Sequence, residues 1–211
     1  MKKIVLLGDS IREGYDKYVK LAFDGVAQVY YPKENCRFTT YIIRNLLDWK
    51  KNLEWGDDVA LVHWNVGLWD DIRMEDGEFL VDLADYKRNI DRICKMLISA
   101  FPQGKFIFAT STPVQEELFG AKKRYNKDTE TYNASACEIV KGYGMEINDL
   151  YSLMSKLPVS YHSDLTHYYR KEGTCAITDA VVDKIEKSLD IKGAALDYDA
   201  LFGDQGTVLG I

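Results

Sequence analysis

Short apolar segments alternate with longer amphipathic segments along most of this 211-residue chain. The first, Lys3–Leu7, is an aliphatic run that stops at Gly8, as expected of a strand buried on both faces. Four further segments predict strands: Val26–Tyr31, Asp58–His63, Lys105–Ala109 and Gly144–Ile147. This alternation constrains the fold more than any other feature of the chain.

The longer segments carry apolar residues at helical spacing. Asp82–Phe101 has the clearest apolar stripe, with Asp82 as the expected N-cap and Pro102 as the stop signal. The other predicted helices are Tyr15–Phe23, Thr39–Lys50, Tyr125–Lys141 and Tyr169–Leu189. Such alternation is typical of parallel strands joined by right-handed crossovers. We therefore predict a three-layer α/β/α fold with a central, mostly parallel five-stranded sheet of flavodoxin-like topology.

The length and net charge of the chain indicate a single domain and exclude some classes of binding partner. The length fits one domain, which we place at residues 1–190, followed by a Gly- and Asp-rich tail at 191–211. The tail is expected to pack on the body or to form a subunit contact, so a homo-oligomer remains an open prediction. The formal charge of −6 argues against a nucleic-acid or anionic-membrane surface. The apolar run at the N-terminus is too short for a secretory signal, so we expect a cytoplasmic protein.

The four cysteines, Cys36, Cys94, Cys137 and Cys175, lie far apart, without a CxxC pair or zinc-ligand spacing. We interpret them as reduced thiols, and we expect no metal and no organic cofactor.

Three polar motifs lie where an α/β sheet places its site, at the carboxyl ends of strands. Gly8-Asp9-Ser10 follows the first strand, and Asn65 lies in His63-Trp64-Asn65-Val66-Gly67 after the third. Taken alone, the first is as compatible with a helix-capping turn and the second with an asparagine that bonds its own backbone.

The third motif, Asp164-Leu165-Thr166-His167, precedes the last helix. Its three-residue spacing lets the Asp164 carboxylate accept a hydrogen bond from Nδ1 of His167, which leaves Nε2 free as a base. Alone, such a pair is more often a polar pair at a helix start. His162, which has no carboxylate before it at this spacing, is interpreted as a loop residue.

Together, the three motifs resemble the SGNH (GDSL-like) hydrolases in order and in residue type, from Lys3 to about Leu189. The resemblance implies an esterase with Ser10 as nucleophile and His167 and Asp164 as its catalytic partners. It also implies that the oxyanion is bound by the backbone N–H of Ser10 and the side chain of Asn65.

One motif departs from that family, which usually has a glycine after strand two whose N–H is a third oxyanion donor. Here the segment reads Glu34-Asn35-Cys36-Arg37, so the resemblance assigns the role to Cys36, with Arg37 as the alternative. A thiol nucleophile at Cys36 is less well supported than Ser10, because no base is adjacent to it in sequence.

The substrate is expected to be a small acyl ester, an acetyl group on a carbohydrate, with Trp64 and Trp69 as candidate lining residues. Aromatic residues beside a core strand are more often packing residues. Two alternatives stay open: a lysophospholipase or thioesterase of the same fold, and a non-catalytic α/β ligand-binding protein.

Overall fold

The structure is a computed structural model that describes residues 1–203 and contains a five-stranded parallel sheet. Its strand order is β2-β1-β3-β4-β5, and every pairing is parallel. The strands are β1 (Lys2–Leu7), β2 (Ala27–Tyr30), β3 (Val59–Asn65), β4 (Lys105–Ala109) and β5 (Glu146–Asn148). All five predicted strands are present, although β3 continues to Asn65 and β5 begins two residues later than expected.

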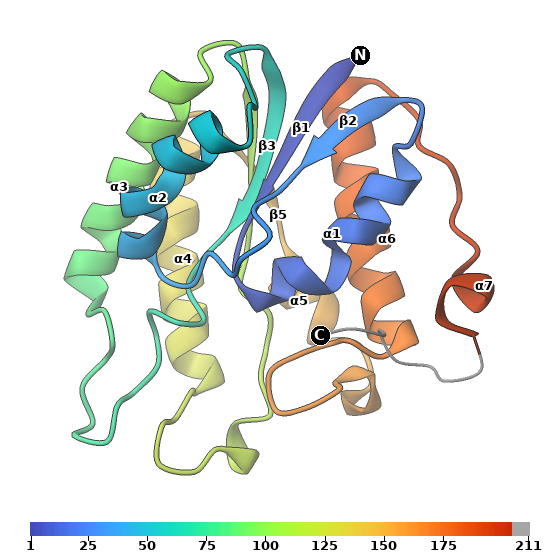
Figure 1. The fold of residues 1–211 in the computed structure, drawn as a ribbon. Helices are drawn as coiled ribbons and strands as arrows, with labels where there is room; N and C mark the ends of the chain where they lie inside the picture. The colour runs from blue at the N-terminus through green and yellow to red at the C-terminus, as the bar shows by residue number, and fades with distance from the viewer. Residues whose placement is uncertain (204–211) are drawn as a thin grey trace.

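Helices cover both faces of the sheet, which gives the predicted three layers. Figure 1 shows α2, α3 and α4 on one face and α1 and α6 on the other. The longer helices are α1 (Ser10–Ala22), α2 (Thr39–Asn52), α3 (Leu83–Ala100), α4 (Asn126–Gly142) and α6 (Lys171–Leu189). Four short elements complete them: α5 (Leu150–Met154), α7 (Tyr198–Phe202) and two 3₁₀ turns at Glu116–Leu118 and Val159–Tyr161.

The first helix begins five residues earlier than its apolar pattern predicts. Asp9 caps it, because the Asp9 carboxylate accepts a hydrogen bond from the N–H of Ile11 at 3.0 Å. Ile11 is the one buried apolar residue of the first turn, so the cap marks a start that the apolar pattern alone does not show. Ser10 is therefore the first helical residue and follows the strand with only Gly8 and Asp9 between them.

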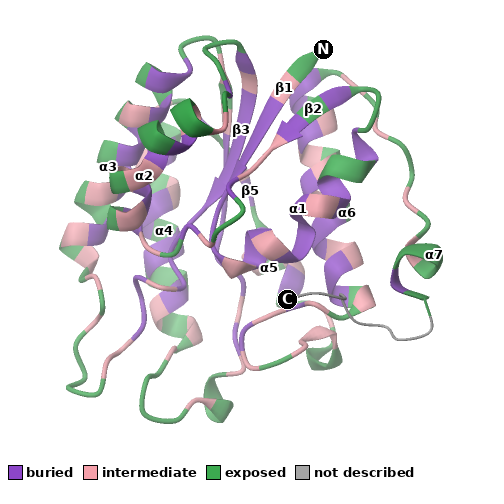
Figure 2. Cartoon of the chain, viewed as in Figure 1, coloured by how far each residue is buried: buried purple, intermediate pink, exposed green. Residues whose placement is uncertain are grey.

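Each face of the sheet has its own core, and Figure 2 shows the buried strands between the two helical layers. Along β1 the side chains alternate between these cores: Val5 and Leu7 face one, Ile4 and Leu6 the other. All four are fully buried. The aliphatic run that predicted this strand is explained by burial on both faces.

The described part of the C-terminal tail packs on α1 and α6. The N–H of Ala194 donates to the carbonyl of Ala22 at 2.7 Å, and the Tyr198 hydroxyl donates to Asp179 at 2.7 Å. Phe202 stacks on Tyr18 with ring centroids 5.4 Å apart. Residues 204–211 of the predicted tail lie outside the described residues. Within residues 1–203, no helix has the length and apolar character needed to span a membrane.

Candidate active site

The three sequence motifs meet at the carboxyl end of the sheet. Ser10 opens α1 directly after β1, Asn65 is the last residue of β3, and His167 lies in the loop before α6. Because β1 and β3 are adjacent parallel strands, their carboxyl ends present Ser10 and Asn65 at the same edge. The loop before α6 brings His167 across 157 positions of sequence to the same place.

Ser10, His167 and Asp164 form one hydrogen-bonded chain. Ser10 Oγ lies 2.6 Å from His167 Nε2, and His167 Nδ1 lies 2.8 Å from Asp164 Oδ2. The other carboxylate oxygen of Asp164 accepts from the N–H groups of Thr166 at 2.7 Å and His167 at 2.8 Å. With Nδ1 donating to the carboxylate, Nε2 is the acceptor for the Ser10 hydroxyl.

The environment keeps Asp164 ionised. Partial burial opposes ionisation, but the N–H groups of Thr166 and His167 and the His167 imidazole outweigh it and lower the pKa of Asp164. A fixed negative charge on this carboxylate holds the imidazole in one tautomer and would stabilise its protonated form.

Asn65 is tied to the turn that carries Ser10. Its Nδ2 donates to Asp9 Oδ1 at 2.9 Å, and Asn65 itself is 2% exposed. A carboxamide nitrogen carries two N–H groups, so one remains for another acceptor. Gly8 makes this contact possible, because a Cβ at that position would lie 1.9 Å from Asn65 Oδ1.

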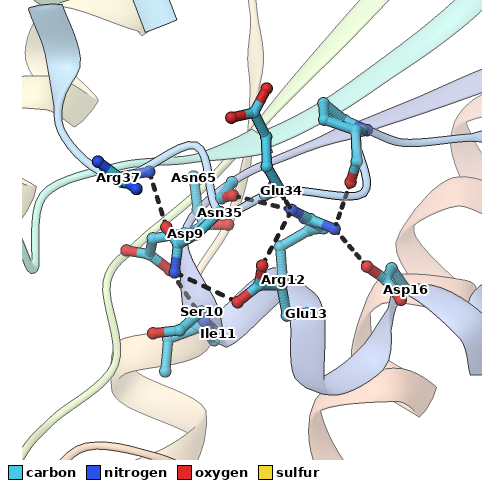
Figure 3. A network of polar contacts seen from close by, with 12 residues as sticks. Asp9, Ser10, Ile11, Arg12, Glu13, Asp16, Glu34, Asn35, Arg37 and Asn65 are labelled. Atoms are coloured by element: carbon cyan, nitrogen blue, oxygen red, sulfur yellow. Dashed lines mark hydrogen bonds and ion pairs between the residues drawn. The ribbon is translucent and has the colours of Figure 1, made fainter. Parts of the chain in front are cut away.

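The loop after β2 is held against α1 by the buried guanidinium of Arg12 (Figure 3). Arg12 donates to the carbonyls of Pro32 at 3.0 Å and Glu34 at 2.6 Å and pairs with Asp16 one turn along the helix. Arg12 is 1% exposed, so these contacts are made away from water. They fix the path of the segment in which a third oxyanion donor was expected.

Neither expected donor of this segment has an unoccupied N–H. The Cys36 N–H donates to the carbonyl of Gly8 at 3.0 Å, which corrects the expectation that it points at the substrate. The Arg37 N–H donates at 2.8 Å to the side-chain oxygen of Asn35, and Arg37 is exposed. Arg37 has a φ of +51°, the left-handed conformation that glycine adopts without steric cost. Burial raises the pKa of the Cys36 thiol to about 11, so this thiol is neutral near pH 7.

Several solved structures have a fold similar to that of this chain. A lipase/acylhydrolase from Enterococcus faecalis has a TM-score of 0.70 at 20% identity, over 93% of this chain and 100% of its own. A GDSL-like lipase from Bacteroides thetaiotaomicron has a TM-score of 0.69 at 18% identity, over 89% of each chain. An acetyl xylan esterase has a TM-score of 0.70 at 13% identity, over 87% and 99%. The chain has the fold of the GDSL-like, or SGNH, hydrolases. No family model and no curated protein matches its sequence.

In this SGNH fold the site opens into a cavity of about 590 Å³. Most of its lining residues have polar side chains, and Leu68 is the one aliphatic residue among the described residues that form it. The lining residues are Ser10, Glu13, Asn35, Leu68, Trp69, Arg124, Asp164, Thr166, His167 and Tyr169.

The two candidate aromatic residues have different positions. Trp69 lines the cavity and is partly exposed. Trp64 is fully buried and packs edge-on against Phe108, with ring centroids 4.8 Å apart, in the core under α2, α3 and α4. The prediction that Trp64 lines the substrate site is therefore wrong. Along β3, alternate side chains face opposite sides of the sheet, and position 64 faces the core.

Two cavity residues are not indicated by the sequence pattern: Arg124 and Tyr169. Arg124 comes from a long loop without a motif. Tyr169 could have been noticed, since it follows His167 by two positions. However, nothing in the sequence shows that its ring turns back toward Ser10.

The other two histidines lie in the core and in a loop, and neither is part of the Ser10–His167–Asp164 chain. His63 is fully buried between Tyr15 and Asn148, and this burial lowers its pKa to about 3. The His162 ring packs on Tyr168, as a loop residue would. Within residues 1–203, no group of three His, Cys, Asp or Glu side chains is placed to hold a metal ion.

Proposed function

We propose that this chain is a serine esterase of the SGNH, GDSL-like hydrolase family that forms an acyl-enzyme on Ser10. The observation that carries the proposal is the 2.6 Å contact between Ser10 Oγ and His167 Nε2. A capping serine has no need of an imidazole whose second nitrogen is bound to a carboxylate. The three groups lie at the sheet edge where the fold places active sites.

In the proposed reaction His167 takes the proton of Ser10 as the hydroxyl attacks the ester carbonyl. Asp164 holds the imidazolium that forms. His167 then protonates the leaving alcohol, and a water molecule repeats the sequence on the acyl-enzyme and releases the acid.

The negative charge that develops on the carbonyl oxygen must be stabilised by hydrogen-bond donors that are in position before the reaction. We assign these to the Ser10 N–H and to the second N–H of Asn65. The Ser10 N–H lies in the first turn of α1, whose N–H groups have no acceptor within the helix. For Arg37 to supply the third donor, its N–H must first break its hydrogen bond with the side chain of Asn35. Each donor contributes on the order of 3 kcal/mol to lowering the barrier.

The substrate that fits the cavity best is a short acyl ester, and we propose an acetyl ester on a carbohydrate. The cavity is lined mainly by residues with polar side chains and by the partly exposed Trp69, which suits a sugar ring better than an alkyl chain. One protein of the same fold is an acetyl xylan esterase. We also propose a cytoplasmic location, which suits four cysteines that form no disulfide.

A fluorophosphonate probe tests the proposal, because it labels a serine that a base activates at neutral pH. We expect wild-type protein to be labelled and Ser10→Ala not to be. Ser152→Ala is the matched control, since the Ser152 hydroxyl bonds the Asp149 carboxylate at 2.6 Å without a histidine. It should be labelled like wild type. Absence of labelling in folded wild-type protein would favour a ligand-binding protein instead.

A further inference from the structure

The cavity beside Ser10 contains a guanidinium that the proposed chemistry does not use. Arg124 lies in the loop between β4 and α4, far in sequence from the three motifs. Apart from His167, it is the one basic side chain among the described residues that line the cavity. Its side chain is 13% exposed, so the charge is largely removed from water.

Contacts on one side of Arg124 fix its orientation. Its Nε donates to the backbone carbonyl of Leu68, and its guanidinium carbon lies 5.6 Å from the ring centroid of Phe119. Leu68 belongs to the same loop as Trp69, another cavity residue. The guanidinium is therefore held in place before any ligand binds.

The terminal nitrogens of Arg124 have no such partner. In the described part of the chain, neither Nη1 nor Nη2 makes a hydrogen bond, and the nearest carboxylate oxygen, Oδ1 of Asp71, lies 3.9 Å from Nε. Asp71 is itself fully buried and accepts from Thr129. Both nitrogens line the cavity and are not buried atoms, so water solvates them in the absence of a ligand. An anion that enters the cavity can replace this water with charge-assisted hydrogen bonds to a guanidinium that is already oriented.

The carboxylates of the cavity already have partners. Asp164 is bonded to His167, and Glu13 accepts from Asn35 at 3.2 Å and lies 3.8 Å from Arg12. Neither carboxylate can accept hydrogen bonds from Nη1 or Nη2 of Arg124 while it keeps these contacts. An incoming ligand can do so.

We propose that Arg124 binds an anionic group of the substrate, so that the preferred ester carries a carboxylate near the bond that is cleaved. This inference rests on the proposed esterase function and adds the substrate class to it. A guanidinium suits the role because two parallel N–H donors match the two oxygens of a carboxylate. The carboxylate belongs to the acyl part or to the alcohol part of the ester, and the test distinguishes them.

The experiment compares matched neutral and anionic esters. On the acyl side, the pair is p-nitrophenyl butyrate and p-nitrophenyl hemisuccinate, whose acyl groups have the same number of carbon atoms. On the alcohol side, it is an acetylated methyl galactoside and the corresponding acetylated galacturonic acid. We expect kcat/KM of wild type to favour the anionic ester in one of the two pairs. That preference should weaken as salt is raised, since a partly exposed ion pair is screened.

Arg124→Gln should lower kcat/KM for the anionic ester by about 10–100-fold, which corresponds to losing a charge-assisted hydrogen bond. Neutral esters should change by no more than about twofold. Lys123→Gln removes the same charge from an exposed neighbour and should leave both unchanged. Arg124→Lys, which keeps the charge without the fork, should fall between them. Thermal unfolding of each variant shows whether the fold is kept.

The outcomes separate the two proposals. Turnover of neutral esters without any preference for an anionic ester would overturn the role of Arg124 and leave the esterase intact. An equal loss on neutral and anionic esters in a folded Arg124→Gln variant would also overturn it, because it would assign Arg124 to the chemistry. If wild type hydrolyses none of the four esters and no fluorophosphonate labels it, the esterase proposal fails.

Discussion

The ring of Tyr169 stacks on the imidazole of His167, with centroids 4.7 Å apart and planes inclined by 16°. The hydroxyl of the same tyrosine donates to the backbone carbonyl of Ser10 at 2.7 Å. One side chain thus contacts both members of the proposed nucleophile–base pair. Gly14 of α1 leaves room for it, because a Cβ there would lie 2.8 Å from the tyrosine ring.

Tyr169 should therefore act as a positioning residue. Tyr169→Phe keeps the stacked ring and loses the bond to Ser10, so kcat should fall by about 3–10-fold, as expected for one neutral hydrogen bond. Tyr169→Leu loses both contacts and should fall further. KM and the thermal midpoint should change little in the Phe variant, since the group that is lost contacts Ser10 and not the substrate.

The adjacent tyrosine supplies the control. Tyr168 also donates to a backbone carbonyl, that of Pro113 at 2.9 Å, and also packs on a histidine, His162. Tyr168→Phe removes the same hydroxyl without touching Ser10 or His167. If both Phe variants lose kcat equally, the effect of Tyr169 is structural and the assignment is wrong.

The layers, the strands and the hydrogen-bonded chain of Ser10, His167 and Asp164 could be predicted because each depends on a local pattern. The β1 run is aliphatic on both faces because two helical layers cover it, and the Asp164–His167 spacing lies within one turn. Ser10 could be linked to these only through the rule that strand ends meet at one edge of a parallel sheet.

The rest of the site depends on where long-range contacts direct a side chain. Trp64 and Trp69 are indistinguishable in sequence, yet the first is fixed in the core by strand alternation and the second lies in a loop at the cavity. The sequence position of Cys36 suits an oxyanion donor, but its N–H donates to the carbonyl of Gly8. Arg124 has no motif because its partner is a backbone carbonyl of a distant loop.

Asn65 should contribute to turnover more than to stability. Asn65→Ala is expected to lower kcat by about 10²–10³-fold, because a donor to the developing oxyanion is removed. Labelling by the fluorophosphonate probe should persist. Asn133→Ala is the control, since that asparagine is also buried but bonds only the backbone of Ser111 in the described chain. A loss of folding in Asn65→Ala would instead make the contact with Asp9 its main role.

Arg12 should be essential to stability. Arg12→Met would leave Asp16, whose side chain is 9% exposed, without its partner and two carbonyls without donors. Breaking a buried pair in this way costs about 3–5 kcal/mol of unfolding free energy, measurable by urea denaturation. Arg44→Met breaks an exposed pair of the same spacing with Asp48 and should cost at most about 0.5 kcal/mol. Similar losses in the two variants would refute this role of Arg12.

Two adjacent buried acids should make stability fall as pH rises. Burial raises the pKa of Asp70 to about 8 and that of Asp71 to about 7, although hydrogen bonds from Thr39 and Thr129 oppose it. An acid with a raised folded pKa holds its proton in the folded state and loses it in the unfolded chain. Its stabilising effect is complete below about pH 4 and is lost as pH rises toward the folded pKa.

Each such group should lower the unfolding free energy by roughly 1.4 kcal/mol per pH unit within that window. Asp70→Asn keeps an oxygen for the Thr39 N–H and should remove one of the two slopes, as urea unfolding at pH 5, 6 and 7 would show. Asp58 is the contrast, because its hydrogen bond from Lys3 lowers its pKa. Asp58→Asn should bring no gain toward neutral pH. An unchanged slope in Asp70→Asn would contradict the predicted titration.

Acyl-chain preference follows from what lines the cavity. Each methylene of an acyl chain gains about 0.8 kcal/mol only where apolar surface covers it, and Leu68 is the single aliphatic side chain among the described lining residues. We expect kcat/KM on p-nitrophenyl esters to be highest for acetyl and to fall by butyryl. Trp69→Ala should reduce turnover of sugar acetates more than that of p-nitrophenyl acetate, because only the sugar loses a stacking surface. Trp64→Phe, a change within the core, should not alter this ratio. Rates that rise steadily from acetyl to octanoyl would instead indicate an apolar groove beyond the cavity and a lipid or thioester substrate.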